Sequence, residues 1–536
     1  MLTKNGRFID FFIMLILSAV YILPLFLPGD ILHTVDQDTY FHLSRIIGLD
    51  NVWESPVNFN NFGHHGTMIN VFYPWLTTYP AYLFWKLTGS LVWGYNLYYL
   101  VVTFLTMIIS YLVMNNIKNK GIISLLFAIV YTFSAYRAID IFQRASLGEA
   151  VSLTFLPIVL LGCYEIYIRN FTKWYWLALG MSLIVYTHLL SVAMVTMIIA
   201  ITIIVSFYFW DNKLERIISL LKAVLLTLFL TAGFLVPFIQ QYLAQELKVP
   251  SGRVLVGMQP ADMLIQMVNN NLSAYTSGLL ILICIVSTIP QLKRLSLVDQ
   301  FIFFLGVTIL FCSTALFPWS LFTNTVFAKI QFVWRLNAFT TLFVSYAASI
   351  GIYKGFLKKN KRKIVLVFLS IIFIHGSGII NLYTLNKENI SRISSQNIIT
   401  KVGNYEHTDY ANRESIKHQE FVVKNKYMLG GREVVPKVSY NSNTFTIEVQ
   451  NASNVSKDLI TPLYKYHGQK VKINKKEASS KLSAMGTTEL IIPPGDSTIT
   501  ISYKYTNVAI ISTFISLSTL FLLSIFGLIK RWRNHT

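Results

Sequence analysis

Long apolar runs separated by short polar segments fill most of the chain between residues 9 and 383, and one more run follows near the C-terminus. A run of about 17–25 apolar residues can cross a bilayer as a helix. Runs of that length lie at 9–28, 91–114, 149–168, 217–238, 337–353, 364–383 and 508–529. Shorter runs lie at 121–135, 274–290 and 297–317, and 174–209 can form two helices that turn at Thr187-His188. The pattern predicts a polytopic α-helical membrane protein with about 12 spans.

The distribution of Lys and Arg predicts the direction of these spans. One set of connections carries 19 Lys and Arg with few acids, whereas the short loops on the other side carry 8 Lys and Arg and 9 Asp and Glu. Because basic residues remain on the cytoplasmic side of a membrane, both termini are predicted to be cytoplasmic. This direction holds only if the aromatic segment Tyr73 to Leu87 is interfacial or re-entrant, inside one long first outer loop over residues 29–90.

Residues 385–507 are more polar, and their apolar positions alternate with a period of two. The alternation is clear at 444–450, at 470–475 and at 497–503, which predicts β-strands. We therefore predict a GT-C-like transmembrane domain over 1–384, a small extracytoplasmic β-rich domain over 385–507, and a final span with a basic cytoplasmic tail over 508–536. The basic surplus of the β-rich domain is compatible with an anionic polymer or lipid head group, although an ordinary solvated surface is the favoured interpretation.

Composition narrows the protein class further. The chain is 54% hydrophobic and 13% charged, too few charged residues for a typical soluble domain. Its formal net charge of +20 lies mostly in the predicted cytoplasmic connections, which argues against a nucleic-acid partner. All three cysteines fall in apolar runs, so no disulfide framework is expected. We find no P-loop, Rossmann fingerprint or Gly-x-Ser-x-Gly elbow.

The residues that could perform chemistry gather in the predicted outer segments. Asp36 and Asp38 directly follow the first span, where charge is rare without a function. A carboxylate can take a proton from a sugar acceptor, and arginine can stabilise a phosphate leaving group. The remaining candidates are a third acid, four arginines, a histidine and two aromatic residues: Glu149, Arg45, Arg137, Arg144, Arg335, His188, Trp334 and Tyr73.

Each candidate also has a structural interpretation. Asp36 or Asp38 could cap an interfacial helix that starts near Tyr40. Glu149 could favour the N-terminus of its helix. The arginines could pair with acids or lipid phosphates, His188 could be an ordinary interfacial histidine, and Trp334 could anchor the chain at the membrane interface.

The motif Asp38-Thr-Tyr-Phe41, followed by Arg45 and later by Phe72-Tyr-Pro74, resembles the first outer loop of C-type (GT-C) membrane glycosyltransferases. A closer resemblance is to bacterial YfhO-like proteins and to membrane proteins called 6-pyruvoyl-tetrahydropterin synthase-related. They share the pattern matched here from Asp38 to Leu49, and an Arg-x-x-Leu-Gly-Glu pattern approximated by Arg144 to Glu149. One departure is Gly63-His-His-Gly66, which replaces the Tyr-Gly repeat common in that family.

This resemblance implies a polyprenyl-phosphate-linked sugar as donor and sugar transfer at the outer face. It makes Asp36 or Asp38 the base or a metal ligand. No cofactor is certain; a divalent cation, Mg or Mn, would use Asp38 and Asp140. The pterin label implies no pterin chemistry that these residues support.

We therefore predict a membrane glycosyltransferase that transfers a sugar to a cell-envelope polymer or lipid, among membrane lipids and without a nucleic-acid partner. Three alternatives remain. A polysaccharide polymerase or ligase would usually show arginine-rich outer loops instead of an acidic pair. A transporter would show charges at mid-membrane and internal repeats. A non-catalytic scaffold would use its β-rich domain to bind partners and would not need the acids.

Overall fold

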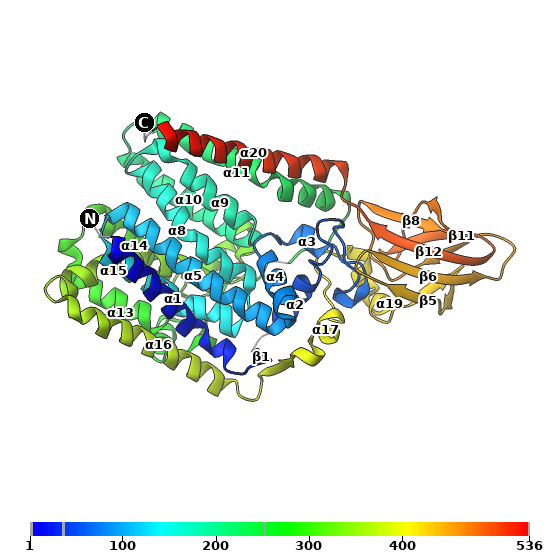
Figure 1. The fold of residues 1–536 in the computed structure, drawn as a ribbon, viewed down its shortest axis with the longest axis horizontal. Coiled ribbons are helices and arrows are strands. Elements are labelled where there is room, and N and C mark those ends of the chain that lie inside the picture. The colour runs from blue at the N-terminus through cyan, green and yellow to red at the C-terminus, as the bar shows by residue number, and fades with distance from the viewer. Residues whose placement is uncertain (1–3, 35–37, 251, 534–536) are drawn as a thin grey trace. The chain divides into compact units, whose positions relative to one another are not determined.

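The computed structural model describes residues 4–34, 38–250 and 252–533 (Figure 1). The chain is 64% helical, with a β-rich region near its C-terminus. It forms two compact units, each assembled from separated segments. We call the first the helical unit (Met1–Thr39, Phe84–Val224 and Ser251–Ser395) and the second the mixed unit (Tyr40–Leu83, Leu225–Pro250 and Gln396–Thr536).

Each predicted apolar run of the helical unit forms a helix. The predicted turn at Thr187-His188 is confirmed, because one helix ends at Val185 and the next begins at Leu189. The helices are α1 (Lys4–Phe26), α5 (Leu91–Lys118), α6 (Gly121–Thr132), α8 (Leu147–Tyr167), α9 (Tyr175–Val185), α10 (Leu189–Ser206), α12 (Pro260–Val268), α13 (Gly278–Thr288), α14 (Leu297–Cys312), α15 (Asn337–Ile352) and α16 (Ile364–Leu385).

Helix α15 lies at the centre of the helical unit. It packs against α6, α8, α13 and α14, and every residue from Asn337 to Gly351 is buried. Most of its side chains therefore contact protein and not the surroundings. A short two-stranded sheet also belongs to this unit, in which β1 (Ile31–Thr34) pairs antiparallel with β2 (Ser391–Ser394).

Eight helices in the described part of the chain are long and apolar enough to cross a membrane. A ninth candidate consists of two helical segments, 121–132 and 135–143, that meet at a bend of 44°. Helix α4 (Tyr79–Thr88) has only ten residues, fewer than a span requires. The fold is therefore compatible with a membrane protein in which the Tyr73 to Leu87 segment is not a span.

The connection from Tyr136 to Glu149, which belongs to the predicted outer segments, is mostly helical and buried. It contains α7 (Ala135–Ala138) and the π-helical turn η2 (Ile139–Gln143), and α8 begins at Leu147 after a short non-helical break at 144–146. Every residue from 131 to 150 is buried. The charged side chains lower the hydropathy of this segment, and they can be buried because they pair with one another inside the unit.

The mixed unit contains two five-stranded antiparallel sheets, with strand orders β10-β11-β7-β3-β4 and β5-β6-β12-β8-β9. The three predicted strand regions are confirmed as β6, β8 and β12. Buried Ile499 of β12 lies opposite Ile447 and Ile473, which places this row of the sheet in the core. The strands are β3 (Tyr427–Leu429), β4 (Arg432–Val434), β5 (Lys437–Tyr440), β6 (Thr444–Asn451), β7 (Lys457–Ile460), β8 (Gln469–Ile473), β9 (Lys476–Ala478), β10 (Lys481–Leu482), β11 (Thr488–Ile492) and β12 (Gly495–Tyr503).

The long first loop shares one hydrophobic core with these sheets. Phe59 packs against Phe445 of β6 at 5.6 Å, and Phe72 stacks on Tyr410 at 4.8 Å. The first loop and the region after residue 396 therefore fold together and not as separate domains. The helices of the first loop are α2 (Asp38–Ile47), α3 (Ile69–Phe72) and α4. The helices that precede β3 are α17 (Ser395–Gly403), α18 (Arg413–Lys417) and α19 (Gln419–Val423).

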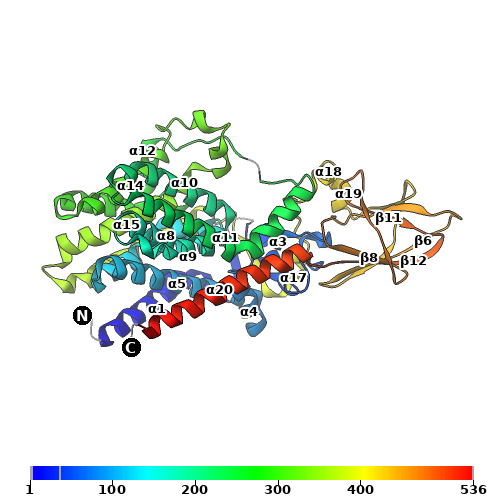
Figure 2. The same cartoon turned by 90° about the horizontal axis from the view of Figure 1, so that it is seen from above.

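Two long helices complete the mixed unit. The C-terminal part of α11 (Lys213–Ala244) runs beside α20 (Asn507–Arg533), as both views show (Figures 1 and 2). Ser516 joins them, because its hydroxyl accepts from the Gly233 amide at 2.8 Å and donates to the Phe229 carbonyl at 3.0 Å. A Cβ on Gly233 would lie 2.9 Å from the Thr513 Cα, so glycine is needed for this close approach.

The Gly63-His-His-Gly66 sequence has a structural explanation. Gly63 has φ +66°, and a Cβ there would lie 2.1 Å from Glu406 Oε1, the atom that binds His65 Nε2 at 3.1 Å. His64 stacks on Tyr440 at 4.2 Å. The four residues therefore join the first loop to the segments around Glu406 and β5.

We expect Gly63→Ala to lower the free energy of unfolding by about 2–3 kcal/mol, since it adds backbone strain and displaces Glu406. Gly431→Ala is the matched control, because Gly431 also has positive φ but nothing lies within 4 Å of its added Cβ. The control should cost only about 1 kcal/mol. Thermal unfolding of the purified full chain measures both, and equal losses would contradict the contact with Glu406.

Candidate functional site

A buried ion cluster in the helical unit brings together four of the predicted candidates, Asp140, Arg144, Glu149 and Arg335. Glu149, in the first turn of α8, accepts a hydrogen bond from the Tyr136 hydroxyl and one from Arg144 Nη1 at 2.8 Å. Arg335 Nε lies 3.3 Å from the same Glu149 oxygen, Oε2. Both carboxylate oxygens of Glu149 therefore have partners within the protein, and this side chain binds both Arg144 and Arg335.

Asp140 extends the ion cluster on the other side of Arg144. Its Oδ1 accepts from Arg144 Nη1 at 2.5 Å, while its Oδ2 is buried with no hydrogen-bond partner among the described residues. The π-helical turn η2 and the chain reversal into α8 bring Asp140, Arg144 and Glu149 to one point.

Arg137 is the third arginine of this region, and it is fully buried without an ion pair among the described residues. Its Nη2 donates to Thr103 Oγ1 at 3.0 Å, and its guanidinium carbon lies 5.0 Å from the centre of the Tyr21 ring. Its Nε and Nη1 have no partner in the described part of the chain. The three arginines (Arg137, Arg144 and Arg335) and the two carboxylates (Asp140 and Glu149) together give this region a formal charge of +1.

His188 and two serines connect the ion cluster to α10. His188 Nδ1 lies 2.8 Å from Ser191 Oγ, which lies 2.9 Å from Ser152 Oγ, whose hydroxyl donates to the Glu149 carbonyl at 2.7 Å. His188 is buried and exerts a Coulombic effect on Glu149. It therefore belongs to the same site as the acids and arginines.

Trp334 lies beside the ion cluster, but protein groups already pack against its ring. Tyr275 and Phe332 stack on it at 4.7 and 5.1 Å, and the Arg144 guanidinium carbon lies 4.5 Å from its centre. This packing fits a role in fixing Arg144 better than a role in stacking on a sugar. Exposed Arg253 lies over Phe332 at 4.6 Å.

Sequence reasoning missed Tyr275 and Arg253. Both lie in connections far from the recognised motifs, and no local pattern marks them. The only available signal for Arg253 was its place among the few basic residues of the predicted outer loops.

Of the two acids after the first span, only Asp38 lies within the described residues. It is exposed and is the first residue of α2, so this helix begins two residues before the predicted start at Tyr40. Its charge acts on Tyr95 of α5, and that of Asp140 acts on Tyr99. The Tyr95 hydroxyl donates to the Tyr99 hydroxyl at 3.5 Å. Asp38 and the ion cluster thus influence one pair of tyrosines; Asp36 lies outside the described residues.

Arg45 and Tyr73 form a structural pair in the mixed unit. Arg45 is 1% exposed, its guanidinium carbon lies 4.1 Å from the centre of the Tyr73 ring, and its Nη2 donates to the Pro74 carbonyl at 2.6 Å. This contact explains why an arginine after the acidic motif occurs together with Tyr-Pro, because Arg45 joins α2 to Tyr73 and Pro74 later in the same loop.

The carboxylates of the ion cluster do not fit a divalent cation. Arg144 and Arg335 already pair with them, and Glu149 has both oxygens engaged, whereas Mg²⁺ and Mn²⁺ need several free oxygen ligands. The described residues include no group of three or more His, Cys, Asp or Glu that could hold a metal ion. We derive no step through a metal.

His407, near Arg45, should make the stability of the protein pH-dependent. Burial lowers the pKa of His407 from 6.5 to about 4; Lys248 and Arg45 act in the same direction, and Asp409 opposes them. Because the folded pKa lies below the unfolded one, stability is fully present above pH 6.5 and is lost as the pH falls towards 4. The loss should reach at most roughly 3 kcal/mol.

The variant His407→Phe keeps an aromatic ring against Phe41, which lies 4.5 Å away, and cannot titrate. We expect it to flatten the dependence of the thermal midpoint on pH between 7 and 4.5. His418→Gln, at an exposed histidine of the same unit, should leave that dependence unchanged. An unaltered slope in His407→Phe would show that other groups cause the acid lability.

Comparison with known proteins identifies no family. No protein-family model matches the chain, and no curated protein matches it. The resemblance to C-type membrane glycosyltransferases therefore depends on the motifs Asp38 to Leu49, Phe72-Tyr-Pro74 and Arg144 to Glu149.

Proposed function

We propose that this protein is a membrane glycosyltransferase that moves a sugar from a polyprenyl-phosphate-linked donor to a cell-envelope polymer or lipid. The observation that carries the proposal is the ion cluster together with buried Arg137, a region of formal charge +1 at the start of two candidate spans, α8 and the helix that contains Arg335. Buried charge of this kind is costly unless it serves a function, and arginine binds phosphate well.

The donor suits the charge of the region. A sugar joined to a polyprenyl phosphate is a phosphodiester with one negative charge, which would neutralise the formal +1 of the three arginines and two acids. The helix N-termini at Leu147 and Asn337 add partial positive charge at the same level. Arg144 and Arg335 are the phosphate-binding residues in this proposal.

In the proposed reaction, the acceptor hydroxyl oxygen forms a bond to the anomeric carbon of the donor sugar. The bond from that carbon to the phosphate oxygen breaks, and polyprenyl phosphate leaves with the electron pair. The hydroxyl proton passes to the carboxylate of Asp36 or Asp38. Arg144 and Arg335 stabilise the charge that grows on the leaving phosphate. Glu149 is a positioning residue in this proposal and not the base, because Arg144, Arg335 and Tyr136 already bind its carboxylate.

The proposed topology places this chemistry at the outer face. It has about 12 spans in a GT-C-like arrangement, with both termini cytoplasmic and the β-rich region extracytoplasmic. The eight long apolar helices support it directly, and α6 with η2, α9, α13 and α14 are the shorter helices that would supply the rest. Nucleotide-activated sugars are absent from that side, so a donor carried by a lipid is needed.

A deletion strain of the host provides the test. We expect loss of one sugar modification on an envelope polymer or lipid, build-up of the lipid-linked sugar, and recovery of both on expression of the wild-type chain. Mass analysis of envelope polymers and of extracted lipids measures these changes. Unchanged polymers and lipid-linked sugars in the deletion strain would refute the proposal.

A further inference from the structure

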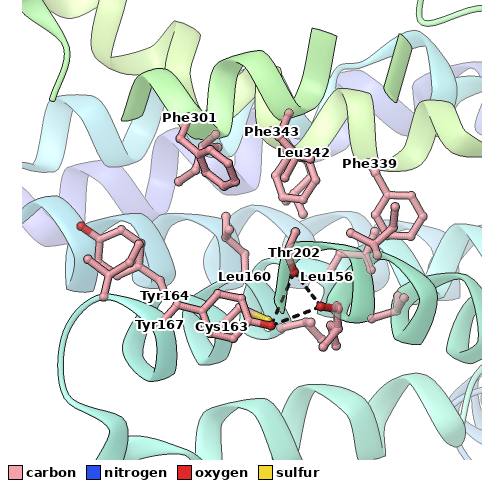
Figure 3. Close-up of a pocket in the computed structure, with 17 residues that line it drawn as sticks. Leu156, Leu160, Cys163, Tyr164, Tyr167, Thr202, Phe301, Phe339, Leu342 and Phe343 are labelled. Carbon is pink, nitrogen blue, oxygen red and sulfur yellow. Dashed lines mark hydrogen bonds between the residues drawn. The ribbon is translucent and has the colours of Figure 1, made fainter. Parts of the chain in front are cut away.

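An apolar cavity lies between α8, α10, α14 and α15 in the helical unit (Figure 3). Its volume is about 80 Å³, and its walls are almost entirely aliphatic and aromatic. Leu160, Phe301, Phe339 and Phe343 point into it from three of these helices (Figure 3). At one side the hydroxyl groups of Tyr167 and Thr202 form a hydrogen bond with each other, with their oxygens 3.5 Å apart. The cavity therefore suits a hydrocarbon.

Three of these four helices, α8, α10 and α15, begin beside Glu149, His188 and Arg335 of the candidate site. Phe339 follows Arg335 by four residues, and Leu156 follows Glu149 by seven, which are about 6 and 10 Å along a helix. On α10, Val195 follows His188 by seven residues. A lipid with its phosphate at the arginines would thus meet apolar walls within one or two helical turns.

A larger apolar hollow, between α13, α15 and α16, fits this arrangement less well. It is lined by Gly351 and Phe356, which follow Arg335 by 16 and 21 residues, about 24 to 32 Å along the helix. A chain in that hollow could not begin at the arginines. The groove lined by Phe229 and Phe526, of α11 and α20, belongs to the other unit.

We propose that the cavity between α8, α10, α14 and α15 holds the first part of the polyprenyl chain, next to the phosphate bound by Arg144 and Arg335. This inference rests on the proposed function. An apolar cavity of about 150 Å³ can bind benzene, so 80 Å³ admits one segment of a narrow chain and excludes a fused ring system. The site recognises a linear hydrocarbon with a phosphate at its end.

The test measures binding of farnesyl phosphate and undecaprenyl phosphate to the purified full chain, separately from sugar transfer. Ile198→Trp, which fills the cavity from α10, should weaken binding of both at least ten-fold. Ile201→Trp is the matched control, since Ile201 lies on the same helix, is 42% exposed and does not line the cavity. Leu156→Phe is a second, smaller filling variant in case Ile198→Trp does not fold.

A photoreactive farnesyl phosphate locates the chain directly. We expect it to crosslink to peptides of α8, α10 and α15, and farnesol without phosphate to do so far less. Crosslinks confined to α13 with α16, or to α11 with α20, would overturn the inference, as would wild-type binding by folded Ile198→Trp and Leu156→Phe. Lipid phosphate bound in the cavity without any sugar transfer would overturn the proposed function and leave this inference standing.

Discussion

Asp38→Asn should reduce sugar transfer by roughly 10²–10⁴-fold while the protein remains folded. Asp38 is exposed at the first turn of α2, and asparagine keeps its size and one acceptor oxygen, so the substitution removes the proton acceptor with little change in packing. The measurement is the rate of product formation from polyprenyl-phosphate sugar in reconstituted vesicles. Asp36→Asn is tested beside it, because the resemblance gives the base to either acid.

Glu54→Gln provides the matched control for this loss. Glu54 is another exposed acid of the first loop, and its Oε2 accepts from Asn443 at 3.2 Å. We expect its transfer rate to stay close to that of the wild type. Full transfer by both Asp36→Asn and Asp38→Asn would show that the acidic motif is structural, and would favour the scaffold or transporter interpretation.

Glu149→Ala should destabilise the fold by about 3–5 kcal/mol, the usual cost of removing one partner from a buried ion pair. Arg144 and Arg335 would remain buried beside an uncompensated charge, and the Tyr136 hydroxyl would lose its acceptor. The thermal midpoint of the purified chain in detergent measures the effect. Glu149→Gln should cost less, because the amide oxygen still accepts a hydrogen bond.

A double-mutant cycle separates this ion pairing from simple loss of packing. If Glu149 acts mainly by neutralising Arg335, then Arg335→Met should cost much less in the Glu149→Ala background than in the wild type. Costs that simply add would contradict the coupling seen at 3.3 Å between Arg335 Nε and Glu149 Oε2.

The sequence predicted the helices and strands well because each depends on local periodicity. The apolar runs, the turn before α10 and the alternating strands β6, β8 and β12 are all properties of neighbouring residues. The core shared by Phe59 and Phe445 depends on contacts between segments far apart in the chain, and hydropathy contains no information about such pairs.

The grouping of the candidate residues was predictable only in part. The motif around Arg144 and Glu149 contains residues that the structure brings together, but their polarity gave no sign that mutual pairing would allow them to be buried. Substrate binding by Arg45 and Tyr73 stays a prediction. Their contact with each other, in which Arg45 also donates to the Pro74 carbonyl, joins positions 28 residues apart, and no local pattern contains it.

The core that joins the first loop to the sheets has a consequence for biosynthesis. Residue 83 ends the loop segment of the mixed unit and residue 396 begins its last segment, so 313 positions separate them. At about 5–20 residues per second, a ribosome needs roughly 15–60 s to cover that distance. During this interval Phe59 and Phe72 have no sheet to cover them. The first loop is therefore the part of the nascent chain most dependent on chaperones, and truncation after α16 would leave it permanently without its partner.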